Sequence, residues 1–300
     1  MKAVVVEGFG GPEQVRIAEV AVPVPAAGQV RIRVRAAGLN PVDGAVRAGV
    51  FGGGDAGPLG LGWDVAGDVD AVGEGVTGWT AGQRVVGLHY GPVKPLGSHA
   101  EYVVLDASAV AAAPESVGVA EAAVLPLSGL TAARAVDLLG LPAGASVLVT
   151  GAAGVVGGLA VQLAAAAGLV VTGLAGAQDE ELVRSLGAVG FVARGEERDA
   201  PVVDGVLDAA VLGQAALGFV RDGGVYVGLH PGAGPAGVRE VRVVEQEVVA
   251  DGELLGRLAR LVDSGVLTLR VGQTYPLAAA AEAHAHLAKP GTRGRLVLTP

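Results

Sequence analysis

Four glycines stand where a predicted strand passes into a predicted helix, in the segment VLVTGAAGVVGGLAVQL at residues 147–163. Gly151, Gly154 and Gly157 fall at positions 1, 4 and 7 of this turn. A helix start offers unpaired N–H groups and a partial positive charge, and glycine lets a diphosphate approach the backbone closely. Because the commoner dinucleotide pattern has its glycines at 1, 3 and 6, a glycine-rich turn without a ligand is the alternative. The turn predicts a dinucleotide site whose residues are Gly151, Ala152, Gly154, Val155, Val156 and Gly157.

The elements that would position this turn alternate between strand and helix from Ser146 onward. Strands are predicted at 146–150, 170–175, 190–193, 203–210 and 223–229. Helices are predicted at 157–168, 179–187, 214–221 and 252–265. Such alternation predicts a parallel sheet with helices on both faces. Before about Val110, short valine-rich runs separated by turn residues predict a β-rich unit, and the tail from 269 reads as strand, helix and strand.

Composition excludes several classes of function. The net charge of −9 and the lack of any Lys/Arg block argue against a nucleic-acid partner. With no cysteine, the chain can form neither a disulfide nor a thiolate metal site. The N-terminal segment lacks the basic-then-apolar layout of a signal peptide, and no apolar stretch has the length and character of a membrane span. We therefore expect a cytoplasmic protein without membrane partners.

Several motifs in order resemble the zinc-free quinone oxidoreductase branch of the medium-chain dehydrogenase/reductase family. The resemblance covers nearly the whole chain. The matching segments are GLNPVDGAVRAG at 38–49, LGLGWDVAGDVDAVGEGVTGWTAGQRVVG at 59–87, GSHAEYVVL at 97–105, AAVLPLSGLTAARA at 122–135, the glycine turn itself, and AEAHAHLAKPGTRGRLVL at 282–298.

This resemblance implies an α/β fold with two domains. A GroES-like β-rich catalytic domain would comprise residues 1–120 and 266–300, and a Rossmann domain with a doubly wound parallel sheet would comprise residues 121–265. The resemblance also implies a homodimer. The implied activity is hydride transfer from NADPH, or from NADH, to a quinone or to the activated C=C bond of an α,β-unsaturated carbonyl compound.

The resemblance also identifies the positions at which zinc-bearing relatives hold their metal. Such relatives have Cys where this chain has Asn40, and a His-Glu pair where it has Trp63 and Asp64. Asp64 alone cannot hold zinc in a tetrahedral N/S site, so we expect no metal. Asp43 and Asp64 are expected instead to hold loops by accepting backbone N–H bonds.

Three residues are the candidate catalytic set. Asn40 matches the family's active-site Asn and would contact nicotinamide and substrate, although Asn also suits a turn before Pro41. Trp63 would wall the substrate site, or would be an ordinary core aromatic. Tyr90 would donate to the enolate oxygen, or would be a surface aromatic. We expect His99 to pack in the core, and His284 and His286, two apart on a helix, to face different directions.

The remaining cofactor candidates follow the strands of the Rossmann unit. Thr131 matches the position that meets the nicotinamide carboxamide, although its hydroxyl could instead bond the preceding helical turn. Gly176 and Ala177 stand where NADP-type relatives place polar and basic residues. Arg194 could stack on adenine and pair with a 2′-phosphate, or be a solvated loop charge. Leu229 and His230 follow the next strand, where a turn role is the alternative for His230.

Two further functional hypotheses stay open at this point. One is a dedicated enoyl reductase of a biosynthetic intermediate, which would use the same chemistry. The other is a cofactor-poor, non-catalytic binding protein on the same scaffold. Val155 replaces a usual glycine of the phosphate turn, and this replacement, with those at Gly176 and Ala177, motivates the second hypothesis.

Overall fold

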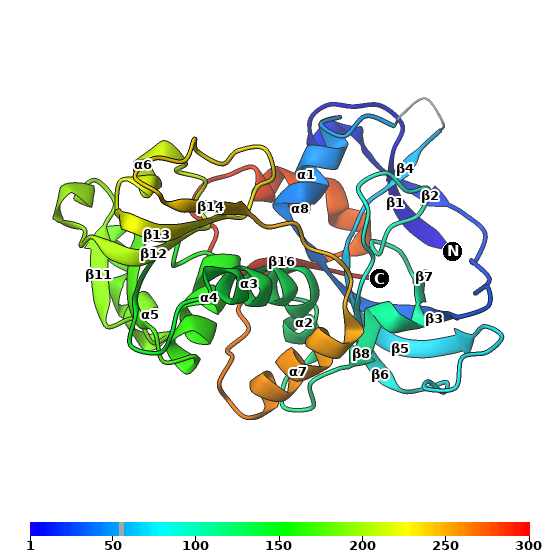
Figure 1. Cartoon of the computed structure of the whole chain (residues 1–300). Helices are drawn as coiled ribbons and strands as arrows, with labels where there is room; N and C mark the ends of the chain where they lie inside the picture. Colours follow the sequence, from blue (N-terminus) through cyan, green and yellow to red (C-terminus); the bar gives the residue numbers. More distant parts are fainter. Residues whose placement is uncertain (54–56) are drawn as a thin grey trace. The chain divides into compact units, whose positions relative to one another are not determined.

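The computed structural model describes residues 1–53 and 57–300 and divides into two compact units (Figure 1). The first unit comprises residues 1–127, 249–263 and 269–300, and the second comprises residues 128–248 and 264–268. Helix α7 (Gly252–Asp263) packs on strand β8 of the first unit, although it falls in the range expected for the Rossmann domain. The chain thus begins and ends in the first unit and enters the second unit twice.

The second unit is built on a parallel sheet with the strand order β11-β10-β9-β12-β13-β14, as far as the described residues go. Its strands are β9 (Ser146–Thr150), β10 (Val170–Ala175), β11 (Gly190–Ala193), β12 (Val203–Asp208), β13 (Val220–Gly228) and β14 (Arg242–Glu245). Figure 1 shows helices α4 (Val155–Ala166) and α5 (Glu180–Ser185) on one face of the sheet and α6 (Gln214–Leu217) on the other. The predicted doubly wound parallel sheet is therefore confirmed.

Two predicted elements of this unit differ from the structure. The helix predicted at 214–221 is a single turn, α6, because Val220 already pairs with Val203 as the first residue of β13. No strand is predicted between 229 and the helix at 252–265. This segment contains β14, whose Val243 and Val244 lie opposite Tyr226 and Val227.

The first unit consists mainly of antiparallel strands. Its sheets have the orders β2-β1-β4 and β15-β16-β3-β5-β6-β8, with β7 paired to β3, among the described residues. Its strands are β1 (Lys2–Val6), β2 (Val15–Glu19), β3 (Gln29–Leu39), β4 (Leu59–Gly60), β5 (Asp64–Val72), β6 (Arg84–Leu88), β7 (Tyr102–Asp106), β8 (Val110–Ala112), β15 (Val271–Pro276) and β16 (Arg295–Thr299). Its other helices are α1 (Pro41–Arg47), α2 (Val119–Ala122) and α8 (Ala280–Leu287), while α3 (Leu125–Leu139) begins here and continues into the second unit.

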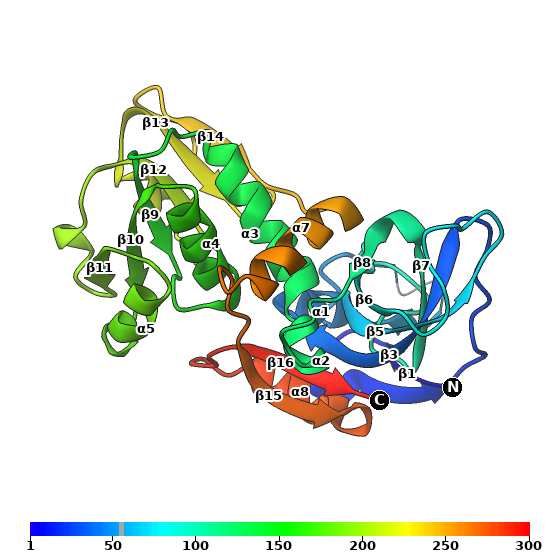
Figure 2. The same cartoon turned by 90° about the horizontal axis from the view of Figure 1, so that it is seen from below.

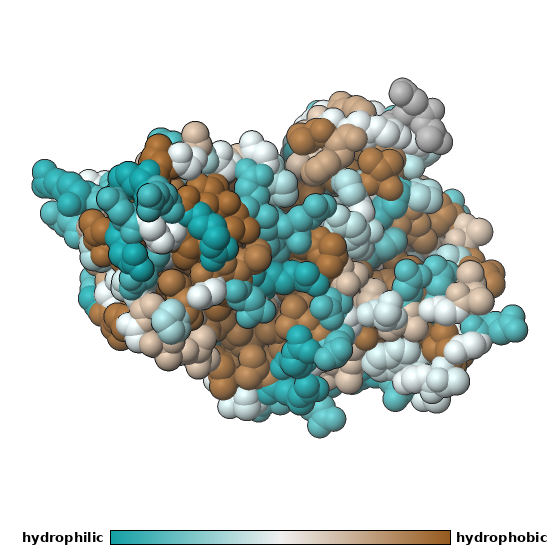
Figure 3. All heavy atoms as spheres, viewed as in Figure 1, coloured by the Kyte–Doolittle hydropathy of each residue, from teal (hydrophilic) through white to brown (hydrophobic). Residues whose placement is uncertain are grey.

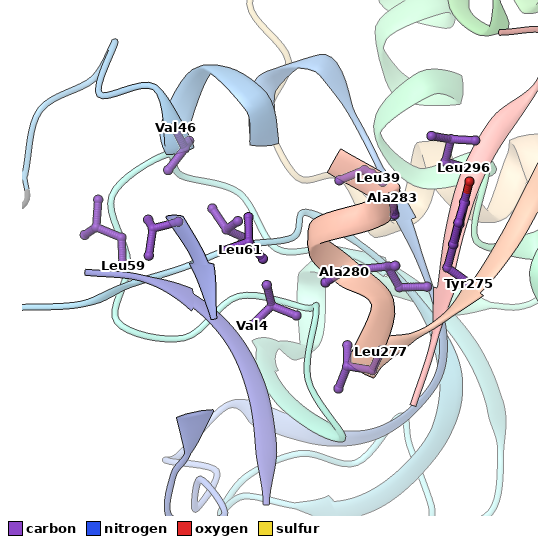
Figure 4. Packing of buried hydrophobic residues seen from close by; sticks show 13 residues of the cluster. Val4, Leu39, Val46, Leu59, Leu61, Tyr275, Leu277, Ala280, Ala283 and Leu296 are labelled. Carbon is purple, nitrogen blue, oxygen red and sulfur yellow. The ribbon is translucent and has the colours of Figure 1, made fainter. Parts of the chain in front are cut away.

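One core of the first unit joins the two ends of the chain. Val4 of β1, Leu39 of β3 and Leu61 pack with Ala280 of α8 and Leu296 of β16 (Figure 4). The strand β16 pairs antiparallel with β3, and Figure 2 shows the β15–β16 strands beside α8. This pairing fixes the position of Leu39 and of the residue that follows it, Asn40.

A buried carboxylate holds the carboxyl ends of three strands of the second unit together. Asp208 Oδ1 accepts from Thr150 Oγ1 at 2.5 Å, and Asp208 Oδ2 accepts from the Tyr226 hydroxyl at 2.7 Å. The N–H of Gly213 donates to the same Oδ2 at 2.8 Å. Since Thr150 directly precedes the glycine turn, this network also fixes where the turn begins.

Replacing Tyr226 by Phe removes one donor from Asp208 and is expected to lower the free energy of unfolding by about 1.5–3 kcal/mol, the usual value for a bond to a charged group. Urea denaturation measures the loss. The control is Tyr102→Phe, which removes the hydroxyl of a half-buried tyrosine in the first unit and should change stability by less than ~0.5 kcal/mol. Equal effects of the two variants would contradict the assigned role of the network.

Candidate active site

The site in the first unit begins at the turn between β3 and α1, which Asp43 holds. The N–H of Asn40 donates to Asp43 Oδ2 at 2.8 Å, and the N–H of Gly62 donates to Asp43 Oδ1 at 2.8 Å. Asp43 is fully buried. The bonds tie the start of α1 to the residue before Trp63, and they confirm that Asp43 holds loops through backbone N–H groups.

Asp64 ties the same turn to a third segment. Its Oδ2 accepts from Asn40 Nδ2 at 2.7 Å, and its Oδ1 accepts from the N–H of Leu127 at 2.6 Å. A Cβ at Gly38 would lie 2.5 Å from Asp64 Oδ2, so only glycine lets the carboxylate approach β3 this closely. The predicted loop-holding role of Asp64 is confirmed.

Burial sets the ionisation of Asp64. Desolvation raises the pKa of this carboxyl from 3.8 to about 7, and the nearby Arg295 guanidinium only partly opposes the rise. Arg295 is itself buried and donates to the carbonyl of Leu39 at 3.2 Å. The Asp64 carboxyl therefore changes from its neutral to its charged form near neutral pH.

Asn40 has the turn position that is the structural alternative for this residue. It precedes Pro41, the first residue of α1, and it is 1% exposed. Its Nδ2 is bonded to Asp64, whereas its Oδ1 is buried and accepts no hydrogen bond within the described part of the chain. A buried acceptor without a donor costs free energy, so a ligand donor such as a carboxamide N–H would fit here.

Trp63 and Tyr90, which come from separate loops, meet in the structure. Their rings pack edge to face with centroids 5.6 Å apart. Trp63 is 5% exposed and Tyr90 is 41% exposed. The pair therefore runs from the buried base of the site to its surface, and the structure brings together two of the three residues predicted as catalytic.

Lys94 belongs to the same group and was not predicted. Its Nζ lies 4.6 Å from the Trp63 ring centroid and donates to the carbonyl of His89 at 2.6 Å. Burial lowers the pKa of Lys94 to about 8, although Asp43 and Asp64 act to raise it. One signal was present in the sequence, because only three of its 21 basic residues are lysines and Lys94 lies in an otherwise apolar loop.

The histidines of this unit are structural. His99 is fully buried and donates from Nε2 to the carbonyl of Gly38 at 3.0 Å, which confirms its predicted packing role. His284 contacts Arg47 and the His99 ring, whereas His286 contacts the Tyr275 hydroxyl, so the two face different directions as predicted. Burial lowers the pKa of both His89 and His284 to about 3, with further lowering at His89 from Lys94. Both are neutral.

Exposed apolar side chains surround the loop that follows α1. Phe9 and Val93 are 43% and 48% exposed, and Val50 and Phe51 are also exposed. A Cβ at Gly49 would meet the Phe9 ring at 2.6 Å, and one at Gly53 would meet Val93 at 2.6 Å, so the loop lies directly against both side chains. Hydrophobic surface gathers beside the end of α1 in Figure 3.

The glycine turn of the second unit has the geometry of a phosphate loop. Gly151 has φ of 60°, and Gly154 has extended backbone as the residue that starts α4. A Cβ at Gly157 would lie 2.2 Å from the Gly151 carbonyl oxygen, so the helix can pack on the turn only with glycine there. The N–H groups of Val155, Val156 and Gly157 lie in the first turn of α4, where no intrahelical acceptor exists. These groups fit a diphosphate.

The N–H of Ala152 does not belong to this donor set. It donates to the carbonyl of Leu174 at 3.1 Å, which ties the turn to strand β10. Ala152 therefore contributes to the shape of the turn, and the amides available to a phosphate begin at the start of α4.

The other cofactor candidates follow the carboxyl ends of neighbouring strands. Gly176 comes directly after β10, Arg194 after β11, and Leu229 and His230 after β13. The N–H of Arg194 donates to the carbonyl of Ala175 at 2.6 Å, which brings Arg194 next to Gly176. Parallel strands end at one edge of their sheet, so these residues share an edge with the glycine turn. Thr131 lies in α3 and is 9% exposed, and among the described residues no hydrogen bond links its side chain to this edge.

Replacing Asp64 by Asn should flatten the dependence of stability on pH. Between pH 4 and pH 7 the folded protein keeps a proton on Asp64 that the unfolded chain releases, because the pKa rises from 3.8 to about 7 on folding. Wild-type stability should therefore fall as pH rises through this window, with this carboxyl contributing up to ~1.4 kcal/mol per pH unit. Above pH 7 its contribution is constant.

The measurement is urea denaturation of wild-type protein and Asp64→Asn at several pH values. Asp199→Asn, at an exposed carboxylate, is the control and should keep the wild-type slope. A wild-type slope in the Asp64 variant would show that the carboxyl is ionised throughout.

Two family models match separate parts of the chain. The alcohol dehydrogenase GroES-like domain matches residues 26–115, and a model described as zinc-binding dehydrogenase matches residues 186–298. Within the part of the chain described, no group of three or more His, Asp or Glu side chains lies close enough together to hold a metal ion. No helix there is both long and apolar enough to cross a membrane.

Similar proteins span the whole chain. A 2-methylene-furan-3-one reductase of Solanum lycopersicum is 34% identical over 100% of this chain and 79% of its own length. A chloroplastic NADPH-dependent alkenal/one oxidoreductase of Arabidopsis thaliana is 33% identical over 100% and 80%. The structure of the quinone oxidoreductase from Coxiella burnetii has a TM-score of 0.91 at 29% identity and covers 100% of this chain and 99% of that one. On these matches, which confirm the resemblance seen in the motifs, the chain is an oxidoreductase of the medium-chain dehydrogenase/reductase family, with a GroES-like unit and a Rossmann-type unit.

Proposed function

We propose that this protein is an NADPH-dependent, zinc-independent reductase that transfers hydride to a quinone or to the activated C=C bond of an enone or enal. The observation that carries the proposal is the bare glycine turn at the start of α4, in a chain similar over its full length to a 2-methylene-furan-3-one reductase. The proposal includes the homodimer and the cytoplasmic location expected from the sequence.

The cofactor would bind along the carboxyl edge of the parallel sheet. The first-turn amides of α4 would hold its diphosphate, and Gly176 and Arg194 would face the 2′-phosphate of NADPH. Asn40, Thr131, Leu229 and His230 are proposed for the nicotinamide portion. When bound, the reduced nicotinamide supplies the hydride.

The residues of the first unit would bind the substrate and stabilise the negative charge that develops on its carbonyl oxygen. Hydride addition to the β-carbon of an enone moves an electron pair toward the carbonyl oxygen, so the protein must offer donors to that oxygen. The exposed Phe9, Phe51 and Val93 suit the apolar body of a quinone or an alkenal. Trp63 and Asn40 take the positions at which zinc-bearing relatives place metal ligands, which supports chemistry without a metal.

A panel of substrates tests the proposal directly. NADPH consumption with quinones, alkenals and cyclic enones is expected, and a narrow preference for one elaborated enoyl compound would favour the dedicated biosynthetic reductase. Failure to bind NADPH or NADH at millimolar concentration would favour the non-catalytic alternative and exclude both enzymes.

Replacing Gly154 by Ala should weaken NADPH binding by at least ~10-fold, a loss of about 1.4 kcal/mol, because the added methyl would stand at the start of α4 where the diphosphate approaches. The fold should survive, since φ is −70° and the Gly151 oxygen, 3.1 Å from the added Cβ, needs to move only slightly. Fluorescence titration measures affinity. Gly256→Ala in α7 is the control, and equal affinities of all three proteins would contradict the phosphate site.

Arg194→Ala should affect the binding of NADPH and of NADH differently. We expect NADPH affinity to fall by about 10-fold while NADH affinity changes less than ~2-fold, because only NADPH carries the phosphate that a guanidinium pairs with. Arg198→Ala, a neighbouring exposed arginine, is the matched control. A parallel loss of both cofactors would assign Arg194 to the adenine ring instead.

A further inference from the structure

Lys94 is a buried cation for which the proposed reaction has so far given no role. Lys94 is 8% exposed, although it follows Val93, which is 48% exposed, and both Lys94 and Tyr90 contact Trp63. Burying an ammonium costs free energy unless the group is well paired. A structural role alone would be served at lower cost by a neutral side chain in this apolar loop.

The contacts of Lys94 leave part of its donor capacity unused. An ammonium has three N–H donors. Within the described residues, its hydrogen bond goes to the neutral carbonyl of His89, and its charge rests on the face of Trp63. The ring favours the cation without accepting a conventional hydrogen bond. Donors are therefore left for an oxygen of a bound molecule.

The charged groups around Lys94 come from three segments. Asp43 of α1 and Asp64 of β5 attract the ammonium, and His89 in the same loop is neutral. Arg295 of β16 attracts the Asp64 carboxylate. Lys94 is thus a cation at the base of the site, with the two carboxylates already held by other donors.

We propose that Lys94 is a catalytic residue whose Nζ donates to the carbonyl oxygen of the substrate, in place of the metal ion used by zinc-bearing relatives. The inference rests on the proposed function. It adds a catalytic residue that the sequence motifs did not indicate. It also requires a substrate on whose oxygen negative charge develops during reduction.

The step balances as follows for an enone. The hydride from the reduced nicotinamide forms the new C–H bond at the β-carbon. The C=C electron pair moves to form the enol double bond, and the carbonyl π pair moves to oxygen. Lys94 transfers a proton from Nζ to this oxygen, and water then protonates the α-carbon while the enol proton returns, through water, to Lys94. For a quinone the same proton completes the hydroquinone.

The acidity of Lys94 suits this task. Since burial lowers its pKa to about 8, the side chain is charged at pH 7 and yet releases a proton more readily than an exposed lysine. The charged form is needed, so the wild-type rate should fall as pH rises above about 8.

The first experiment uses the cofactor-free protein and 4-nitrophenol, a phenol whose absorption reports its ionisation. A cation at the site should lower the pKa of the bound phenol relative to water. Lys94→Met should abolish this shift and Lys94→Arg should retain most of it. Lys289→Met, at an exposed lysine, is the matched control and should behave as wild type. An unchanged shift in Lys94→Met, or no shift in the wild-type protein, overturns the proposal.

The second experiment measures enone reduction. Lys94→Met should lower kcat by about 10²–10³-fold, as loss of an oxyanion donor does, with NADPH affinity unchanged. The decline of the rate above pH 8 should vanish in this variant, and added methylammonium should restore part of the rate of Lys94→Ala, in which the side chain is truncated. A purely structural role would instead lower thermal stability and NADPH affinity together, without rescue, and this result would also overturn the proposal.

Together, the two experiments distinguish a failure of the proposed reductase function from a failure of the proposed role of Lys94. If the wild-type protein reduces no quinone or enone, the proposed function fails, while the 4-nitrophenol shift still decides whether Lys94 stabilises an oxyanion. If reduction proceeds and Lys94→Met retains the wild-type kcat and pH profile, the function stands and the role of Lys94 is refuted.

Discussion

The buried carboxylate of Asp64 is the interaction on which the first unit depends. It holds the Asn40 amide after β3 and the N–H of Leu127 in α3, and it lies near Arg295 of β16. Three segments distant in sequence therefore converge on one side chain. Because the group is fully desolvated, its bonds are short, and Gly38 is required beside it. The position of Asn40 is a consequence of this convergence.

In the second unit, the buried carboxylate of Asp208 likewise joins segments that are distant in sequence. Asp208 gathers donors from β9, β13 and the loop after β12, and in doing so fixes the end of β9 just before Gly151. In the turn that follows, Gly157 packs against the carbonyl oxygen of Gly151. In each unit, a buried acid fixes the position of a segment for which we propose a role in binding.

Much of this arrangement was predictable from local patterns. Strands such as 146–150 and 170–175 are short apolar runs with turn residues at each end, so their type and bounds agree with the structure. The strand β14 was missed because its residues Arg242–Glu245 carry charges at both ends and gain their strand character only by pairing with β13. The helix at 214–221 was overextended because pairing of Val220 with Val203 is a long-range contact.

In the candidate site, too, features with a local sequence pattern were predictable and those that depend on long-range contacts were not. Asp43 and Asp64 were predicted to hold loops, and each does, because acidic residues beside turns commonly accept backbone N–H bonds. The position of Lys94 was missed because it depends on burial against Trp63, a contact between two loops that the local sequence does not reveal. Likewise, the engagement of the Ala152 amide by Leu174 depends on the pairing of β9 with β10.

The pairing of β16 with β3 has a consequence for how the chain acquires its structure. The central strand β3 lies near the beginning of the chain, and one of its partners comprises the residues Arg295–Thr299. The ribosome must therefore synthesise residues up to Thr299 before the first unit can complete its sheet. Residues 128–248 emerge earlier as one continuous stretch and can begin to fold while synthesis continues. The unit that the chain enters first is thus the one that completes its fold last.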